Sequence, residues 1–523
     1  MERIHKKSAL AETSQLLLAA HDLGVELLWE RYEQQLPLCA FTSNGLNCRK
    51  CFQGPCRINP FGDEPSRGIC GADRDQIVME NLFQATLEGV MESARAVRLL
   101  GIGGTDQALP DIASSLPAEV KERLSKAGLL PVRQGDLFSV QNGYFSHKGY
   151  LPQTLRDLTR LGLIQYGFLL EAESSIGRAR REGSAFDPEG VNLLIVGQGP
   201  AGLLQALEGQ AGQRAEGKRI NLLAQGAHRP PSILAVADHG SPELALQMNV
   251  DALIVAPNAS WPGLEKLARE YGIPVILVEG GKPFGQTASE AIDQACRHAR
   301  DASYGTPARM IQAGDAGRGS VLLREKELKQ ALDSGRIQGV AVLFGEANVK
   351  QAFFERTLAL MEAALAERAL VLLGGDLGSQ IDSLTAELGK RKGGQLASLA
   401  AGLEQDGLQP VSSFGSAFEL PRVVSLLHAL SQGRGIGSFP AVIAFPEFFR
   451  TSTWASAVSL LSLGFAVQIG IRLPFWGSPS LVEVIKDEWQ KITGGTLLAA
   501  PALPDASAQA EEMASLLKAR SVR

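Results

Sequence analysis

The chain contains little cysteine, little histidine and no dominant charge. Its 523 residues include six cysteines and seven histidines, and no histidine pair has the H-x-x-x-H or H-E-x-x-H spacing of a helical metal site. The formal net charge is −5, and no basic stripe with interleaved aromatic residues is present, so we expect no nucleic-acid partner. The first residues, MERIHKKSALAET, carry charge without an apolar centre, so we expect no signal peptide and a cytoplasmic location.

One uncharged run, residues 451–471, is long enough to cross a bilayer. It covers 21 positions, but six of them are Ser or Thr and two are Gly. We therefore predict a small-residue helix that ends near Leu463, followed by a buried strand from Phe465 to Ile471. No membrane span is expected.

The cysteines that are present lie close together. Five of the six fall within 32 residues, and four have the spacing C-x2-C-x4-C-x13-C: Cys48, Cys51, Cys56 and Cys70. The segment is rich in Gly and Pro, which permits the sharp turns needed to wrap a metal cluster, and four converging thiolates suit a [4Fe-4S] cluster. Cys39 lies just upstream.

Other interpretations of these thiols remain open. A structural zinc site also uses four thiolates, but usually as two close pairs, and here only Cys48 and Cys51 form a close pair. A disulfide framework requires an oxidising compartment, for which the sequence gives no signal. Unbound structural thiols do not usually cluster in this way. An iron–sulfur cluster is the interpretation that we favour.

The rest of the chain predicts an α/β fold. Residues 1–185 have mostly helical periodicity, with predicted helices at 8–35 and 75–100, and Asp73 or Asp75 is expected to cap the second. Short apolar runs then alternate with helical segments, which is typical of parallel sheets covered on both faces. These runs lie at 191–196, 220–224, 252–256, 274–278, 340–344, 370–374, 439–445 and 465–471, with a helical connector near 322–335 and a surface helix after Pro504.

We therefore predict three domains. A helical iron–sulfur domain covers 1–185, and two Rossmann-like doubly wound parallel-sheet domains cover 186–335 and 336–523. Residues 175–190 are the predicted linker.

The cysteine segment resembles the amino-terminal cluster region of the anaerobic nickel–iron carbon monoxide dehydrogenases, which are relatives of the hybrid-cluster proteins. The resemblance is carried by C-x2-C-x2-GPCRI-x-PFG, by GICGAD, and by an IV-x-x-NL helix that contains Asn81. Weaker similarity continues in VNLLIVGQGP, GVAVLFGEANVKQ, LVLLGGD, SSFGSAF, FPEFF and WGSPSLVEVI, in the family's order. The chain is shorter than typical members.

The resemblance implies roles for the cysteines. In the family, the cysteines that match Cys48, Cys51, Cys56 and Cys70 hold an electron-transferring [4Fe-4S] cluster. The cysteine that matches Cys39 contributes to a second cluster shared across a homodimer axis, together with a cysteine at the position of Asn47. Two Cys39 residues supply only two thiolates, so the usual shared cluster is not expected.

The family's nickel–iron site is not matched. That site requires one histidine and several cysteines, because soft thiolates must hold its metals. The histidine-containing HGHNP segment reads VGQGP at 196–200, the proton path is replaced by MESARAV at 91–97, and the expected lysine is replaced near Ser456. Other residues stand at the cysteine positions: Ala259, Glu346, Asp376 and Ala417. Cys296 lies outside every matching segment. We expect no nickel and no CO oxidation by the family mechanism.

Two further patterns have functional alternatives. Gly197, Gly199 and Gly202 fit G-x-G-x-x-G after a predicted strand, as in a dinucleotide site, but Gln225 stands where a ribose-binding acid is expected. A tight strand–helix turn is the interpretation that we favour. Glu346 and Asp376 follow two predicted strands and are interpreted as helix N-caps, with a hard-ligand metal site or acid–base pair including His228 or His239 as the alternative.

Three functional hypotheses follow. The first is a carbon monoxide dehydrogenase-like protein with one [4Fe-4S] cluster that transfers electrons as a homodimer or with a redox partner protein. The second is an oxidoreductase whose former metal cavity binds another substrate or a nucleotide cofactor. The third is a non-catalytic, redox-sensing subunit of a larger complex.

Overall fold

The structure of the chain is a computed structural model. It describes residues 7–61, 63–99, 111–133, 135–146, 151–176, 190–197, 199–214, 219–225, 234–235, 243, 250–256, 261–278, 282–301, 324–431, 435–499 and 505–521. Most of the predicted linker, His228, His239, Gln198 and Ala259 lie outside the described residues.

The amino-terminal part is helical apart from one small hairpin. Its elements are α1 (Ala11–Asp22), α2 (Leu28–Gln34), α3 (Ala40–Ser43), β1 (Asn47–Cys48), β2 (Cys56–Arg57), α4 (Arg74–Leu99), α5 (Ile112–Ser115), α6 (Ala118–Lys126), α7 (Asp136–Ser146) and α8 (Leu151–Ile176). The predicted first helix is two helices, because Gly24 takes a left-handed conformation with φ +67° just after α1 ends. Asp73 caps α4: its carboxylate accepts from the Gln76 N–H at 2.9 Å, and the Gln76 side chain accepts from the Asp73 N–H at 2.9 Å.

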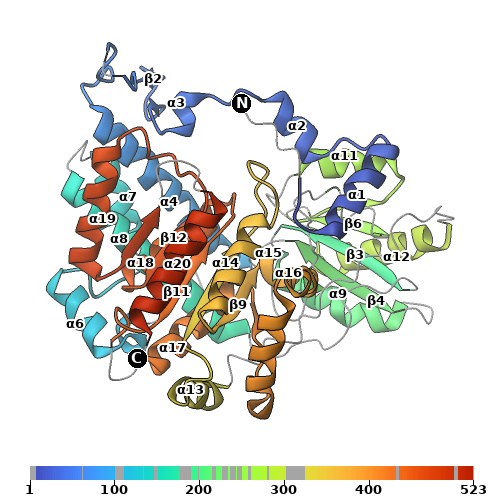
Figure 1. The fold of residues 1–523 in the computed structure, drawn as a ribbon. Helices are drawn as coiled ribbons and strands as arrows, with labels where there is room; N and C mark the ends of the chain where they lie inside the picture. Colours follow the sequence, from blue (N-terminus) through green and yellow to red (C-terminus); the bar gives the residue numbers. More distant parts are fainter. Residues whose placement is uncertain are drawn as a thin grey trace.

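A five-stranded parallel sheet follows within the described residues. Its strands are β3 (Val191–Val196), β4 (Ile220–Gln225), β5 (Leu234–Ala235), β6 (Ala252–Val255) and β7 (Val275–Leu277), in the order β5-β4-β3-β6-β7. Helices α9 (Ala201–Arg214) and α12 (Phe284–Asp301) cover one face, and α11 (Pro262–Glu270) covers the other. Helix α1 packs on the face covered by α11, through Leu16, Ala20 and the nearby Val25, so both helices cover the same side of this sheet (Figure 1).

The second sheet, at the centre of Figure 1, is six-stranded and parallel in the part of the chain that is described. Its strands are β8 (Gly339–Gly345), β9 (Ala369–Gly375), β10 (Val411–Gly415), β11 (Ala441–Phe445), β12 (Ala466–Ile469) and β13 (Thr496–Ala499), in the order β10-β9-β8-β11-β12-β13. Both sheets have the strand order of a doubly wound fold, which reverses between β3 and β6 and between β8 and β11. Ligands of such folds bind at these reversal points.

The helices around the second sheet complete the fold. They are α13 (Glu325–Asp333), α14 (Glu355–Ala366), α15 (Asp376–Ser379), α16 (Ile381–Leu403), α17 (Leu420–Leu430), α18 (Thr451–Ser462), α19 (Pro479–Thr493) and α20 (Ala506–Arg520), with short 3-10 turns η2 (Glu404–Asp406) and η3 (Ala417–Glu419). The predicted connector is α13. The predicted surface helix is α20, which packs on α14 and buries Met513 and Leu517.

The small-residue run contains both predicted elements, α18 and β12. Every residue of α18 after Thr451 is buried, because the helix packs between α4 and α8. Two glycines permit the close contact: a Cβ on Gly89 of α4 would lie 2.1 Å from the Thr451 carbonyl oxygen, and one on Gly162 of α8 would lie 2.7 Å from that of Val458. Among the described residues, no helix is long and apolar enough to span a membrane.

The predicted fold class, an α/β chain with parallel sheets, is confirmed. All eight predicted strands are present, with ends shifted by up to two residues. Two strands of the second sheet were not predicted. Strand β10 has serines at 412 and 413, and β13 has only four residues, so neither forms a long apolar run. The domain boundaries remain a prediction, and α1 packs on the sheet of the predicted second domain.

Candidate functional site

The cysteine loop is held against the start of α4. Strands β1 and β2 pair antiparallel and place Cys48 opposite Cys56. The Asn81 side-chain amide on α4 donates to the carbonyl oxygens of Gly45 and Asn47, both at 2.8 Å, and so anchors the first strand to the helix. This contact explains why an asparagine occupies that position of the IV-x-x-NL motif.

The thiols differ in environment. Cys48 is half-buried and its pKa is raised, first by burial and then by the charges of Glu80, Cys56 and Cys70. The Cys56 sulfur accepts a hydrogen bond from the Ile69 N–H at 3.4 Å. This contact joins the short hairpin to the segment that carries Cys70, so three of the four predicted ligands share one electrostatic environment.

The remaining predicted ligands are exposed. Cys51 lies in the turn between the strands, where its carbonyl oxygen accepts from the Gly54 N–H at 3.2 Å. Cys39 precedes α3, and a hydrogen bond with the Thr42 side chain lowers the pKa of its thiol. Within the described ranges, no three His, Cys, Asp or Glu side chains are arranged as a metal site.

The chemistry of the donor set nevertheless fits an iron–sulfur cluster. The loop supplies four thiols and an N–H directed at one sulfur, and burial, together with repulsion from Glu80 and the neighbouring thiolates, opposes ionisation of Cys48. Bound iron would offset this repulsion, because thiolate ligands are deprotonated on binding. Cys48, Cys51, Cys56 and Cys70 are therefore the residues that would hold the cluster.

A second group of polar residues lies at the strand-order reversal of the six-stranded sheet. Glu346 directly follows β8 and is fully buried. The Thr453 hydroxyl of α18 donates to one of its carboxyl oxygens, and the Phe449 N–H donates to the other at 3.4 Å. Asp376 follows β9, and its Oδ2 lies 3.9 Å from a guanidinium nitrogen of Arg450. We call Glu346, Asp376, Arg450 and Thr453 the strand-end cluster.

Backbone contacts bring the strand-end cluster together. The Glu346 N–H donates to the Glu447 carbonyl oxygen at 3.0 Å, which joins the ends of β8 and β11. A Cβ on Gly345 would lie 2.0 Å from that same oxygen, so only glycine permits this approach. The segment after β11 can then place Phe449, Arg450 and the start of α18 over the end of β8.

Burial determines the protonation of Glu346. Its pKa is raised to about 8, first because of desolvation; Arg450 lowers it and Asp376 raises it. Glu447 is also fully buried, with a pKa of about 7, and accepts hydrogen bonds from the Phe354 N–H at 2.7 Å and the Thr357 hydroxyl at 3.2 Å. At neutral pH the strand-end cluster thus contains one ion pair, Asp376 with Arg450, and a largely protonated Glu346.

The helix-cap interpretation is wrong for both acids. Asp376 is the first residue of α15, whose N-cap is Gly375, and no side chain makes a capping hydrogen bond there. Glu346 is followed by a loop, and the next helix, α14, begins at Glu355. A hard-ligand metal site is also disfavoured, because the Arg450 cation lies beside Asp376.

The residues that sequence reasoning missed are Arg450, Thr453 and Glu447. Glu447 and Arg450 lie just after the apolar run that forms β11. Polar residues at the carboxyl ends of parallel strands are candidate site residues, and this rule, which identified Glu346 and Asp376, applies to them as well. Thr453 has no such signal, because its contact comes from α18.

The glycine-rich loop serves internal packing. Gly197 has φ +81° and allows the turn between β3 and α9. A Cβ on Gly202 would lie 2.6 Å from the Phe284 ring, and one on Gly199 would lie 2.9 Å from a Leu204 methyl group. The close approach that these glycines permit is thus used by the protein's own side chains, which favours the strand–helix turn over a dinucleotide site.

The other departures from the nickel–iron pattern lie in packed segments. Ala417 begins the turn η3 and is buried. Ser456 lies in α18 and donates to the Ser452 carbonyl oxygen at 3.0 Å. Cys296 is half-buried on α12, which packs on the five-stranded sheet, whereas the other five cysteines lie between residues 39 and 70, before α4.

Comparisons with known proteins agree with this architecture. The model of the Prismane/CO dehydrogenase family matches residues 46–116 and 243–503. Carbon monoxide dehydrogenase 2 of Carboxydothermus hydrogenoformans is 26% identical, with 95% of each chain covered, and carbon monoxide dehydrogenase 1 of Methanosarcina mazei is 24% identical, also with 95% of each chain covered. Among solved structures, carbon monoxide dehydrogenase IV from Carboxydothermus hydrogenoformans superposes with a TM-score of 0.80 at 19% identity, covering 98% of this chain and 99% of the other.

We predict that Cys51→Ser abolishes stoichiometric iron binding, because a cubane cluster needs all four thiolates. The measurement is iron and acid-labile sulfide per chain in protein purified without oxygen. Cys296→Ser is the matched control and should retain its iron. Unchanged iron in the Cys51→Ser protein would contradict the cluster assignment.

We predict that Glu346→Gln weakens the pH dependence of stability. The folded protein holds a proton on Glu346 up to about pH 8 that the unfolded chain releases near its ordinary pKa, so this stabilisation is full below about pH 4 and is lost as the pH rises through 8. Glutamine does not titrate, and its single amide oxygen can accept from either the Thr453 hydroxyl or the Phe449 N–H.

The measurement is urea unfolding at pH 6 and pH 8. As the pH rises from 6 to 8, the free energy of unfolding of the wild type should fall by roughly 1 kcal/mol per pH unit more than that of the variant. One proton bound only by the folded state corresponds to about 1.4 kcal/mol per unit. The matched control is Glu511→Gln on the exposed side of α20, which should keep the wild-type slope. Equal slopes for Glu346→Gln and wild type would refute a proton held on Glu346.

Proposed function

Because this chain belongs to the Prismane/CO dehydrogenase family, we propose that it is a carbon monoxide dehydrogenase-like iron–sulfur redox protein that transfers electrons through one [4Fe-4S] cluster and lacks a competent nickel–iron site. When bound by Cys48, Cys51, Cys56 and Cys70, the cluster would accept and return one electron at a time. The protein's own residues supply the thiolates, the Ile69 N–H near Cys56, and the anchor from Asn81.

The observation that carries the proposal is the composition of the strand-end cluster. The family resemblance assigns cysteines to the positions of Glu346 and Asp376, at the reversal point of the six-stranded sheet. Here these positions hold carboxyl groups, and Arg450 brings a cation beside them. Soft metals prefer thiolates and are repelled by a fixed positive charge, so the residues present do not fit a nickel–iron cluster.

The small number of cysteines outside the cysteine loop also argues against a nickel–iron site. Apart from the five cysteines between residues 39 and 70, the chain has only Cys296, which lies on α12 and is absent from the strand-end cluster. A cage for several soft metals requires several thiolates in one place. No step of CO oxidation is therefore assigned to this chain.

The exposed side chains of the cysteine loop support a partner. Phe52 is fully exposed and Ile69 is 65% exposed, beside the exposed Cys51 and Cys70. Large apolar side chains gathered on one loop usually mark a protein interface. We propose that a second copy of the chain, or a redox partner protein, covers this loop and approaches the cluster closely enough for electron transfer.

An enzyme with a new substrate in the former metal cavity is less well supported. Glu346 and Glu447 have pKa values suited to proton transfer near neutral pH, but both side chains are fully buried and bonded to neighbouring groups. The glycine-rich loop is filled by Phe284 and Leu204. Neither place offers a substrate the access that such an enzyme requires.

The proposal is tested by comparing two reductants. Dithionite should produce the EPR signal of a singly reduced cluster in protein purified without oxygen, whereas CO should produce neither that signal nor reduction of a viologen dye. A carbon monoxide dehydrogenase serves as the positive control for the dye assay. Dye reduction that depends on CO and on this protein would overturn the proposal.

A further inference from the structure

A cavity of about 830 Å³ lies beside the cysteine loop. One wall comes from residues 40–65 and the start of α4, and the other comes from residues 472–479, which connect β12 to α19. The cavity is thus formed by two segments about 400 residues apart in the sequence. Its volume is within the range of small-molecule sites, which is roughly 300–1,000 Å³.

Three arginines line this cavity: Arg57, Arg74 and Arg472. The Arg57 guanidinium lies over the Phe41 ring, 5.6 Å from its centroid, and the Arg472 guanidinium donates to the Asn44 side-chain oxygen. Among the described residues, no carboxylate forms an ion pair with any of the three. The aromatic and amide contacts orient Arg57 and Arg472 without compensating their charge.

The acidic residues nearby are engaged elsewhere. Glu64, the one acid in the lining, accepts hydrogen bonds from the Ser66 N–H at 2.9 Å and the Ser66 hydroxyl at 3.0 Å, and these bonds lower its pKa. Asp73 caps α4, and Asp75 accepts from the Ser478 hydroxyl. The lining therefore carries three guanidinium cations and one carboxylate, which leaves an excess of positive charge.

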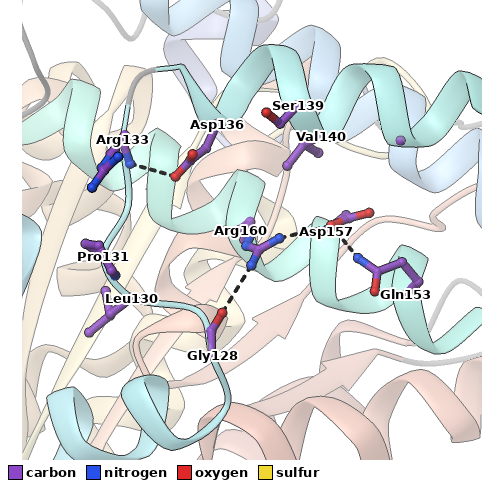
Figure 2. A pocket seen from close by; sticks show the side chains of 11 residues that line it. Gly128, Leu130, Pro131, Arg133, Asp136, Ser139, Val140, Gln153, Asp157 and Arg160 are labelled. Carbon is purple, nitrogen blue, oxygen red and sulfur yellow. Dashed lines mark hydrogen bonds and ion pairs between the residues drawn. The ribbon is translucent and has the colours of Figure 1, made fainter.

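A second cavity, of about 740 Å³, differs from the first in the balance of charges in its lining (Figure 2). It is lined by Arg133 and Arg160 but also by Asp136 and Asp157. Arg160 lies 3.7 Å from the Asp157 carboxylate and donates to the Gly128 carbonyl oxygen at 3.1 Å, and Asp157 also accepts from Gln153 at 2.9 Å. The two arginines of this second cavity are balanced by two aspartates in the same lining, so its charge does not indicate an anion-binding site.

We propose that the cavity beside the cysteine loop binds a phosphate-bearing ligand of the size of a nucleoside diphosphate. Guanidinium groups bind phosphate oxygens through paired, charge-assisted hydrogen bonds, and three of them match the charge of a diphosphate. The Phe61 ring, which is 88% exposed, offers a face on which a planar base can stack. Asn59 adds an amide at the same wall.

A ligand in this cavity would contact the cysteine loop as well as residues 472–479. Arg57 directly follows Cys56, and Arg74 lies four residues after Cys70. A ligand held by Arg57, Arg74 and Arg472 together would link the two ends of the cysteine segment to residues 472–479. This inference does not rest on the electron-transfer role, because it requires only the folded loop and the three arginines.

The test is isothermal titration calorimetry under anaerobic conditions with the intact, cluster-containing protein. The probes are ADP, inorganic pyrophosphate and adenosine. We expect ADP and pyrophosphate to bind and adenosine not to bind, with affinity falling as salt is raised. Tighter binding of ADP than of pyrophosphate identifies a nucleotide, and equal binding identifies the phosphates as the recognised group. Absence of binding by both ADP and pyrophosphate at millimolar concentration would overturn the proposal, as would equal binding of adenosine.

Variants locate the site. Arg74→Gln should weaken binding at least about tenfold, because a charge-assisted contact to phosphate is lost. Arg133→Gln, which removes the same charge from the cavity of Figure 2, is the matched control and should bind like the wild type. Equal affinities for wild type and Arg74→Gln would refute this site. Iron content and far-UV circular dichroism verify the fold of each variant, and Arg472→Gln replaces Arg74→Gln if that variant does not fold.

Discussion

The buried charge at the end of the six-stranded sheet constrains much of the surrounding structure. A carboxylate in a dry interior must either be paired with a cation or take up a proton. Asp376 is paired with Arg450, whereas Glu346 holds its proton up to about pH 8. For these contacts to form, Arg450 and Thr453 must lie at the ends of β8 and β9. They therefore fix the position of the start of α18 relative to the sheet.

The same constraint extends along the chain from β11. Glu447 joins the end of β11 to Glu346 through its backbone and to Phe354 and Thr357 through its side chain. The helix that follows, α18, is buried between α4 and α8, and α4 also anchors the cysteine loop through Asn81. One continuous set of contacts therefore connects the strand-end cluster with the loop that carries the thiols.

These two places have opposite chemistry. The cysteine loop offers soft, exposed sulfur ligands next to exposed apolar side chains, as expected where an electron enters or leaves a protein. The strand-end cluster offers hard, buried oxygen ligands and a guanidinium, which stabilise the sheet but cannot hold soft metals. This division underlies the proposal of a protein that retains the electron-transferring part of its family and lacks the part that reacts with CO.

Sequence reasoning located the eight strands that form continuous apolar runs, and it placed Glu346 and Asp376 at the ends of two of them, because such runs and the residues that follow them are visible in the sequence. It did not find the ion pair with Arg450, since that contact joins residues 74 positions apart in a way that no local pattern encodes. It assigned helix caps to both acids, because a carboxylate after a strand and a glycine resembles a cap when its tertiary partners are unknown. For residues 197–202 the sequence favours a tight strand–helix turn, but it does not indicate the residue that packs there, because Phe284 lies more than 80 residues away.

The most direct measurement is a metal analysis of protein purified without oxygen, giving iron, sulfide, nickel and zinc per chain. One cubane cluster requires about four irons and four sulfides per chain, and we expect no nickel. Nickel together with roughly eight or more irons per chain would contradict it and would mean that a nickel–iron site is present after all.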